Sequence, residues 1–177
     1  MHTMDNRPIY LHGLEGSPQG VKGAWMIQKY NAIAPSMPAK MGDPNAFPRC
    51  FSIAAQSVSH SSPSFIVGSS FGGALLMKLI LEGIWRGPSL FIAQAGVRYG
   101  LGDRLPEEVP AILIHGKQDT LIPPSDSETI AHNSGANTRL WLVDGTHTLH
   151  NIIEDGTLER AIHTLMKWPA TARTKDH

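Results

Sequence analysis

The sequence predicts an α/β protein, a three-layer α/β/α sandwich built on a mostly parallel sheet of six strands. Two observations lead to this prediction. Short apolar runs alternate with helix-length segments through the whole chain, and several of the runs end at a glycine. In addition, no change in composition divides the 177 residues. We therefore expect one domain over residues 1–168, followed by a flexible tail at residues 169–177.

The six expected strands are short apolar runs bounded by glycine, proline or small polar residues. The segment 31–38 is the weakest of them. In chain order, the expected strands are 8–13, 31–38, 64–69, 89–96, 111–116 and 138–143.

Helices are expected between these strands. Ser17 can cap the first helix, with Pro18 at its first position, because proline has no N–H to lose there. Asp43 and Pro44 repeat this pattern and predict a helix that extends to Ser59. Further helices are expected at 71–83, 123–135 and 149–168, and Gly156 weakens the continuity of the last one.

Composition excludes several classes of partner. Lys and Arg together number 15, as do Asp and Glu, so the formal net charge is zero and predicts no nucleic acid or membrane partner. The single cysteine, Cys50, excludes an internal disulfide and suits a reducing cytosol. We find no signal peptide or apolar run of membrane-spanning length, so we expect a cytoplasmic protein. The sequence leaves a homodimer open.

The segment Gly68-Ser69-Ser70-Phe71-Gly72 has the pattern G-x-S-x-G between an expected strand and an expected helix. Such a turn exposes the central serine as a nucleophile, and glycines two residues away on each side leave room for it. Ser70 has these glycines, whereas Ser69 would have bulky side chains at both positions. The alternative is a tight turn that only ends a strand. We predict Ser70 as the nucleophile.

A serine nucleophile needs a base, and the base needs an acid that orients it. Asp119 follows the fifth expected strand, and His147 follows the sixth. Because ligands of a parallel sheet bind at the carboxyl ends of its strands, these loops meet the serine turn at one edge. We predict Asp119 as the acid and His147 as the base.

Alternatives remain for both roles. His150 competes with His147, although we expect it to start the last helix. Asp144 could replace Asp119, but it lies only three residues before His147, and Asp103 is a further candidate.

Acyl transfer also requires donors for the developing oxyanion. We expect the backbone N–H groups of Phe71 and Leu14 in this role, with Gly13 allowing the loop to turn and His12 bracing it. The predicted substrate pocket comprises His12, Gly13, Ser69 and Ala95.

The segments LHGLEGSP, GSSFGG, LIHGKQDTLIP and DGTHTL together resemble the α/β-hydrolase superfamily. The short chain and the H-G-x-x-x-S-P loop are similar to the small, lidless YqiA-like esterases. The resemblance implies hydrolysis of a small acyl ester or thioester through an acyl-serine, without metal or organic cofactor. It also implies a core that lacks the two N-terminal strands of the full fold.

Only a short segment separates the fourth and fifth expected strands, so we expect no cap domain and an open site for short acyl groups or an ester on a larger molecule. Two other functions are compatible with these residues. The same triad could serve an acyltransferase or an amidase. The scaffold could instead be a non-catalytic module that binds a small ligand.

Overall fold

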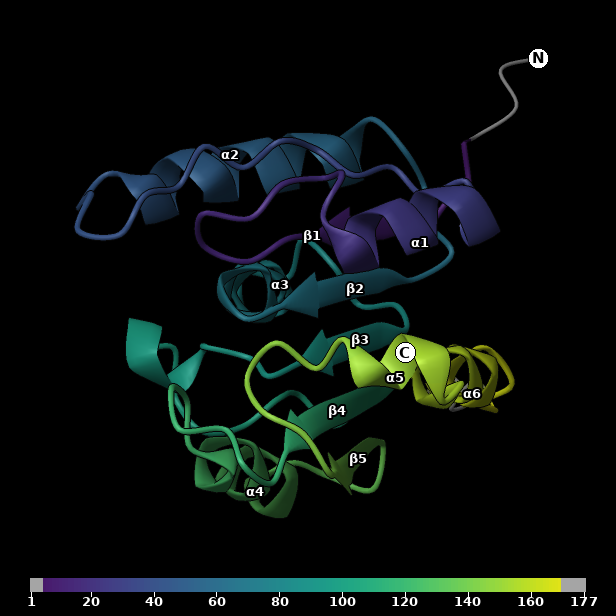
Figure 1. Cartoon of the computed structure of the whole chain (residues 1–177). Coiled ribbons are helices and arrows are strands. Elements are labelled where there is room, and N and C mark those ends of the chain that lie inside the picture. The colour runs from purple at the N-terminus through teal and green to yellow at the C-terminus, as the bar shows by residue number, and fades with distance from the viewer. Residues whose placement is uncertain (1–4, 170–177) are drawn as a thin grey trace, which may run out of the picture.

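The computed structural model describes residues 5–169, so the expected tail lies outside the described residues except for Pro169. One parallel sheet of five strands runs through the molecule in the order β1-β2-β3-β4-β5 (Figure 1). Its strands are β1 (Ile9–Leu11), β2 (Ile66–Ser69), β3 (Ser89–Ile92), β4 (Ala111–Gly116) and β5 (Thr138–Val143).

Helices cover both faces of this sheet and confirm the predicted three-layer arrangement. The first face carries α2 (Ala46–Ser59), α3 (Phe71–Leu81) and α4 (Pro124–Asn133). The second carries α1 (Val21–Tyr30), α5 (Asn151–Glu154) and α6 (Thr157–Met166). A short 3-10 helix, η1 (Val97–Tyr99), follows β3.

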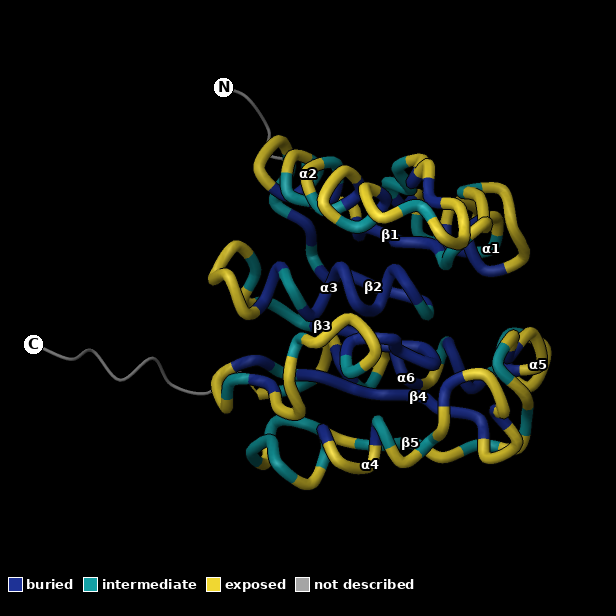
Figure 2. The backbone as a smooth tube through the Cα atoms, turned by 90° about the vertical axis from the view of Figure 1, so that its left-hand side faces the viewer, coloured by how far each residue is buried: buried dark blue, intermediate teal, exposed yellow. Residues whose placement is uncertain are grey.

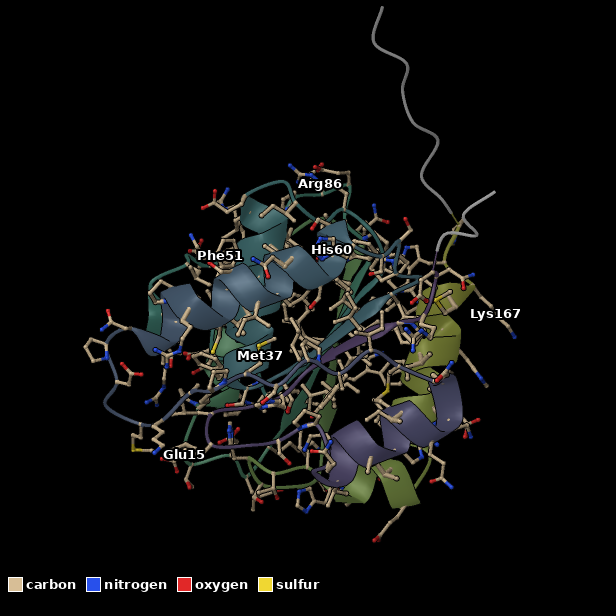
Figure 3. The ribbon with its side chains drawn as sticks, turned by 90° about the horizontal axis from the view of Figure 1, so that it is seen from above. Glu15, Met37, Phe51, His60, Arg86 and Lys167 are labelled. Carbon is tan, nitrogen blue, oxygen red and sulfur yellow. The ribbon has the colours of Figure 1, made fainter. Side chains whose placement is uncertain are left out.

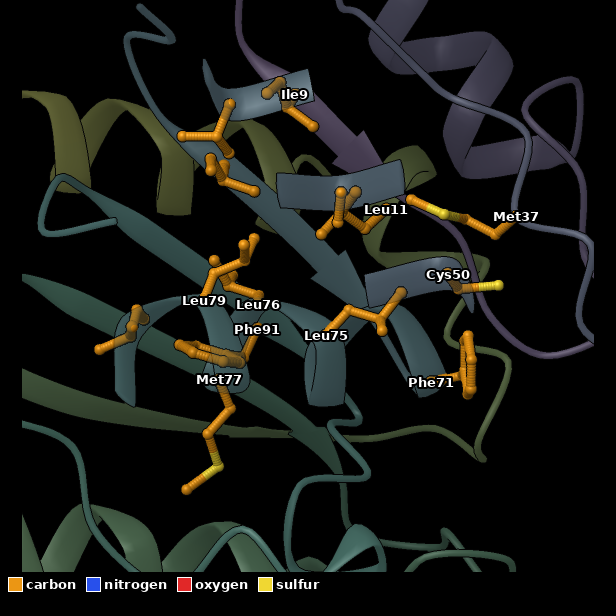
Figure 4. Close-up of a cluster of buried hydrophobic side chains, with 14 of the residues drawn as sticks. Ile9, Leu11, Met37, Cys50, Phe71, Leu75, Leu76, Met77, Leu79 and Phe91 are labelled. Carbon is orange, nitrogen blue, oxygen red and sulfur yellow. The ribbon is translucent and has the colours of Figure 1, made fainter. Parts of the chain in front are cut away.

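Alternation along the strands divides the core between the two faces. Ile9 and Leu11 pack with α2 and α3, in the cluster shown in Figure 4, whereas Tyr10 packs on the opposite side with α1. The strands β1 to β4 are buried along their whole length, and α3 is buried at nearly every position, while outer helices such as α2 and α1 keep an exposed side (Figure 2). Central strands buried on both faces are typical of parallel sheets.

The prediction of six strands is wrong, because the segment 31–38 forms a single bridge beside β1. Ile33 pairs with Ile9, and its carbonyl oxygen accepts a hydrogen bond from Tyr10 N–H at 2.9 Å. Pro35 has no N–H to donate, and the N–H of Met37 is bonded to a side chain, His12 Nε2, at 2.9 Å. The ladder therefore ends after one residue.

Three predicted helix boundaries also change. The second helix begins at Ala46 with Asn45 as its N-cap, instead of at Pro44 with Asp43 as the cap. The first helix begins at Val21 with Gly20 as its N-cap, because residues 17–20 form a turn in which Gly20 N–H bonds to Ser17 O at 3.1 Å. The last predicted helix is two helices, α5 and α6. Gly156 separates them with a φ of 76°, a backbone conformation that favours glycine.

The carboxyl ends of all five strands lie at one edge of the sheet (Figure 1), and the loops that leave them are close together there. This edge is the expected place for a ligand site in a parallel sheet. None of the helices described within residues 5–169 is both long and apolar enough to cross a membrane.

Candidate active site

Ser70 occupies a strained turn between β2 and α3. Its φ of 53° and ψ of −112° are unusual for a residue with a side chain. A Cβ at Gly68 would lie 2.5 Å from the carbonyl oxygen of Gly72, and a Cβ at Gly72 would overlap the carbonyl oxygen of Leu11. The two glycines thus let the turn close on itself and pack against β1, whereas the sequence suggested that they make room beside the serine.

Three side chains from separate loops form a continuous hydrogen-bonded set. His147 Nε2 lies 2.9 Å from Ser70 Oγ, and His147 Nδ1 lies 2.8 Å from Asp119 Oδ2. The loops follow β2, β4 and β5, in the order that the sequence predicted. Since Asp119 is a carboxylate that only accepts, His147 donates from Nδ1 and is free to accept the Ser70 proton at Nε2.

The carboxylate of Asp119 is buried but well supplied with donors. Its Oδ1 accepts hydrogen bonds from the N–H groups of Leu121 and Ile122, both at 2.9 Å. Burial alone would raise the pKa of Asp119, but the bonds from Ile122, His147 and Leu121 outweigh it and lower that pKa below its ordinary value. The residue is therefore ionised at neutral pH and suited to orient a histidine.

The alternative residues lie elsewhere. Asp144 pairs with Lys117 at 3.1 Å, and its side chain is 86% exposed. Asp103 accepts a hydrogen bond from Asn133 Nδ2 at 2.9 Å. His150 is the N-cap residue of α5 and lines the cavity at Ser70, but within residues 5–169 it makes no side-chain hydrogen bond. None of them joins the hydrogen-bonded set.

A cavity of about 450 Å³ opens in front of Ser70. It is lined by every residue that the sequence placed in the site except Asp119, which lies behind His147. The predicted residues on its wall are His12, Gly13, Leu14, Ser69, Ser70, Phe71, Ala95 and His147. These residues thus surround one space, and their role in binding a substrate stays a prediction.

The expected oxyanion donors lie beside the serine. A Cβ at Gly13 would be 3.5 Å from Ser70 Cβ, so the loop after β1 packs against the serine turn. Within the described residues, the backbone N–H groups of Leu14 and Phe71 make no hydrogen bond, which leaves both available to a ligand. His12 braces this loop as predicted, since its Nδ1 lies 2.8 Å from Gly13 O and its Nε2 accepts from Met37 N–H.

Comparison with known proteins gave matches among solved structures only, because no family model and no curated protein matches the chain. A protein from Agrobacterium vitis, provisionally named a hydrolase, superposes with a TM-score of 0.75 at 18% identity over 91% of this chain and 88% of that one. Mouse alpha/beta hydrolase domain-containing protein 10 matches with a TM-score of 0.71 at 16% identity, covering 89% and 90% of the two chains.

A third match comes from the work on LipS and LipT, two metagenome-derived lipolytic enzymes, with a TM-score of 0.66 at 16% identity over 95% and 97% of the chains. The chain has the α/β-hydrolase fold. As the sequence predicted, the described residues form no cap domain, because between β3 and β4 the chain forms only η1 and irregular segments.

One residue at this site was not predicted from the sequence. Lys22 is buried in the cavity wall, and its Nζ donates to the carbonyl oxygen of Thr148, next to His147, at 2.5 Å. Burial lowers the pKa of Lys22 to about 8. A lysine near the start of a surface helix is usually exposed, so the sequence contained no sign of this burial.

The surroundings of the serine are also supported by polar and aromatic contacts. The hydroxyl of Tyr10 lies near Ser69, and its burial raises the pKa of that hydroxyl above the ordinary value. Phe71 makes edge-to-face contacts with Phe47 and Tyr99. Glu15, labelled in Figure 3, lies on the loop after β1, where its carboxylate accepts from Met41 N–H at 3.3 Å.

No group of three His, Cys, Asp or Glu side chains within residues 5–169 is arranged to hold a metal ion.

Proposed function

We propose that the protein is a serine hydrolase that cleaves an acyl ester or thioester through an acyl-serine intermediate. Ser70 is the nucleophile, His147 the base and Asp119 the residue that orients the base. The observation that carries the proposal is the continuous path of hydrogen bonds from Ser70 Oγ through His147 to Asp119. The names of the structural neighbours, which include lipolytic enzymes, support the same reaction class.

In the first half-reaction, Ser70 Oγ attacks the acyl carbon while its proton passes to His147 Nε2. The bond from the acyl carbon to the leaving oxygen or sulfur then breaks, and Nε2 returns the proton to the leaving group. Asp119 stabilises the imidazolium that forms between these transfers.

In the second half-reaction, water gives one proton to His147 Nε2 and attacks the acyl carbon. The bond to Ser70 Oγ breaks, and the proton returns to Oγ. In both halves the carbonyl oxygen of the acyl group becomes negative, and the N–H groups of Leu14 and Phe71 are the donors that can stabilise it.

The test is labelling with a fluorophosphonate, which reacts with an activated serine whatever its substrate. We expect one adduct on the wild type, detected by intact mass, and none on Ser70→Ala. Ser69→Ala is the matched control, because it removes a neighbouring hydroxyl, and it should retain the adduct. An unlabelled but folded wild type would contradict the proposal and favour a binding module.

A further inference from the structure

Four large apolar side chains are exposed around the mouth of the cavity. Val21, Met41, Tyr99 and Leu121 are 53, 73, 39 and 55% exposed, and all four line the cavity in front of Ser70. We call them the apolar rim. They come from the start of α1, the segment before α2, η1 and the loop after β4, so the rim surrounds the opening from several directions.

Exposed apolar side chains are concentrated at the rim. Nine large apolar side chains are exposed in the described part of the chain, and four of them belong to the rim. An apolar group of this kind around a concave site marks a place where an apolar ligand is buried. The rim continues outward from the apolar inner wall, where Phe71, Ala95 and Ile122 lie.

We propose that the apolar rim binds the alkyl chain of a medium-chain acyl group that extends beyond the cavity. This inference rests on the proposed serine hydrolase activity and replaces the short acyl group that the sequence suggested. Ser70, the inner wall and the rim line the same cavity, so a longer acyl chain on Ser70 buries more apolar surface there than an acetyl group does. No cap helix covers the rim among the described residues, so the chain is bound at an open surface.

The experiment compares kcat/KM for p-nitrophenyl acetate and p-nitrophenyl octanoate. We expect the wild type to prefer octanoate. Met41→Ser with Val21→Ser should reduce kcat/KM for octanoate by about 10-fold or more and leave acetate nearly unchanged. Met166→Ser with Leu142→Ser is the matched control, since these exposed residues lie away from the cavity.

A wild type that prefers acetate, or a double variant that retains the octanoate preference, would overturn the inference. Fluorophosphonate labelling separates the two proposals. An enzyme that is labelled and cleaves acetate, but shows no effect of the rim, retains the proposed function and loses only this inference. An unlabelled wild type overturns both.

A second and independent observation concerns a buried polar network behind the site. Gly96 N–H donates to Gln94 Oε1 at 2.7 Å, and Gln94 Nε2 donates to Ser127 Oγ at 3.1 Å. Ser127 Oγ lies 2.7 Å from His115 Nδ1, and His115 Nε2 lies 3.2 Å from Asp119 Oδ2. The side chains of Gln94, Ser127 and His115 are buried from solvent.

The donors and acceptors of this network assign one tautomer to His115. The carbonyl oxygen of Ile122 lies 3.0 Å from His115 Nε2 and can only accept, so Nε2 carries a hydrogen and donates to it. Nδ1 then accepts from the hydroxyl of Ser127. Asp119 Oδ2, the oxygen that accepts from His147, lies 3.2 Å from the same Nε2.

The geometry points to His115 as a positioning residue that holds Asp119 and weakens its pull on the His147 proton. This assignment also rests on the proposed function. An N–H group 3.2 Å from a carboxylate oxygen stabilises its negative charge and makes it a weaker acceptor, so without His115 the imidazolium of His147 would be better stabilised. The network ends near the serine, because Ala95, between Gln94 and Gly96, donates from its N–H to Ser70 O at 3.1 Å.

The readout is the pH profile of kcat/KM. His115→Leu should move the midpoint of the acidic limb upward by about half a unit to one unit. His115→Gln should restore the wild-type midpoint, since its amide can donate to Asp119. Among the described residues, the titratable group beside His115 is Asp119, which in turn pairs with His147. The other titratable or charged residues that line the cavity, unchanged by the substitution, are Tyr10, His12, Glu15, Lys22, Arg98, Tyr99 and His150.

A rate loss in His115→Leu without a shifted midpoint indicates a packing role only and would overturn the assignment. If His115→Leu does not fold, His115→Met replaces it, because a methionine side chain also has no N–H group to place beside Asp119. The midpoint should again move upward, and an unmoved midpoint overturns the assignment. His163→Leu, on the exposed side of α6, is the control. Labelling by a fluorophosphonate at pH 8 shows whether Ser70 is still reactive.

Discussion

Gly72 packs against Leu11 so closely that a side-chain carbon at position 72 would overlap the carbonyl oxygen of residue 11. This contact joins the first turn of α3 to the end of β1, and it brings the loop that carries Leu14 beside Ser70. The turn around the serine is thus defined by the backbone of two neighbouring strands.

Gly72→Ala should destabilise the protein by about 2 kcal/mol or more, because either β1 or α3 must move. Urea unfolding measures this effect. Gly13→Ala is the control, since a Cβ there meets its nearest neighbour, Ser70 Cβ, at an ordinary 3.5 Å. Equal stability of the two variants would show that the elbow adapts to a side chain at position 72.

His147→Ala should lower kcat/KM by at least about 10³-fold, because Ser70 would have no base within hydrogen-bond distance. His150→Ala should lose far less, since its side chain makes no hydrogen bond within residues 5–169. Steady-state kinetics with one activated ester compares the two. A larger loss in His150→Ala would assign the base to that residue.

The acid can be tested in the same way. Asp119→Asn should reduce kcat by about 10²–10⁴-fold, since an amide can favour the wrong tautomer of His147. Asp144→Asn is the matched control, because that carboxylate is exposed and pairs with Lys117. Similar losses in both variants would contradict the assignment of Asp119.

Local sequence patterns were sufficient to predict many of the strands and helices. The strands β4 and β5 coincide with the predicted ranges, since each is a short apolar run between residues that disfavour strands. The prediction of a strand at 31–38 was wrong because strand propensity does not show which N–H groups find a partner. In this segment Pro35 has no N–H group to donate. The prediction of Ser17 as the N-cap was also wrong, because the N-cap is Gly20 and the helix begins at Val21.

Residues of the candidate site differ in how far the sequence alone could predict them. Ser70, Asp119 and His147 each follow a strand, so sequence alone predicted that they meet, and their catalytic role stays a prediction. His115 was visible only as part of a strand. Its link to Asp119 depends on which face of β4 it occupies, which requires the three-dimensional packing of α4.

Lys22 provides the last prediction, which concerns stability against pH. Its pKa is about 8 in the folded protein and 10.5 as an ordinary lysine, because burial disfavours the charged form. Between these values the unfolded chain binds a proton that the folded one has lost, so the wild type gains stability as the pH rises from 8 to 10.5. Below pH 8 the full cost of the buried charge remains.

Lys22→Met removes this cost and should raise the free energy of unfolding by about 1–3 kcal/mol at pH 7, less whatever the bond to Thr148 O contributes. The gain should shrink as the pH rises from 8 toward 10.5. Urea unfolding at pH 7 and pH 10 measures it. Lys29→Met is the control, because Lys29 lies on the same helix but pairs with Glu159 at the surface. A loss of stability in Lys22→Met that is equal at both pH values would show that the hydrogen bond to Thr148 outweighs the buried charge.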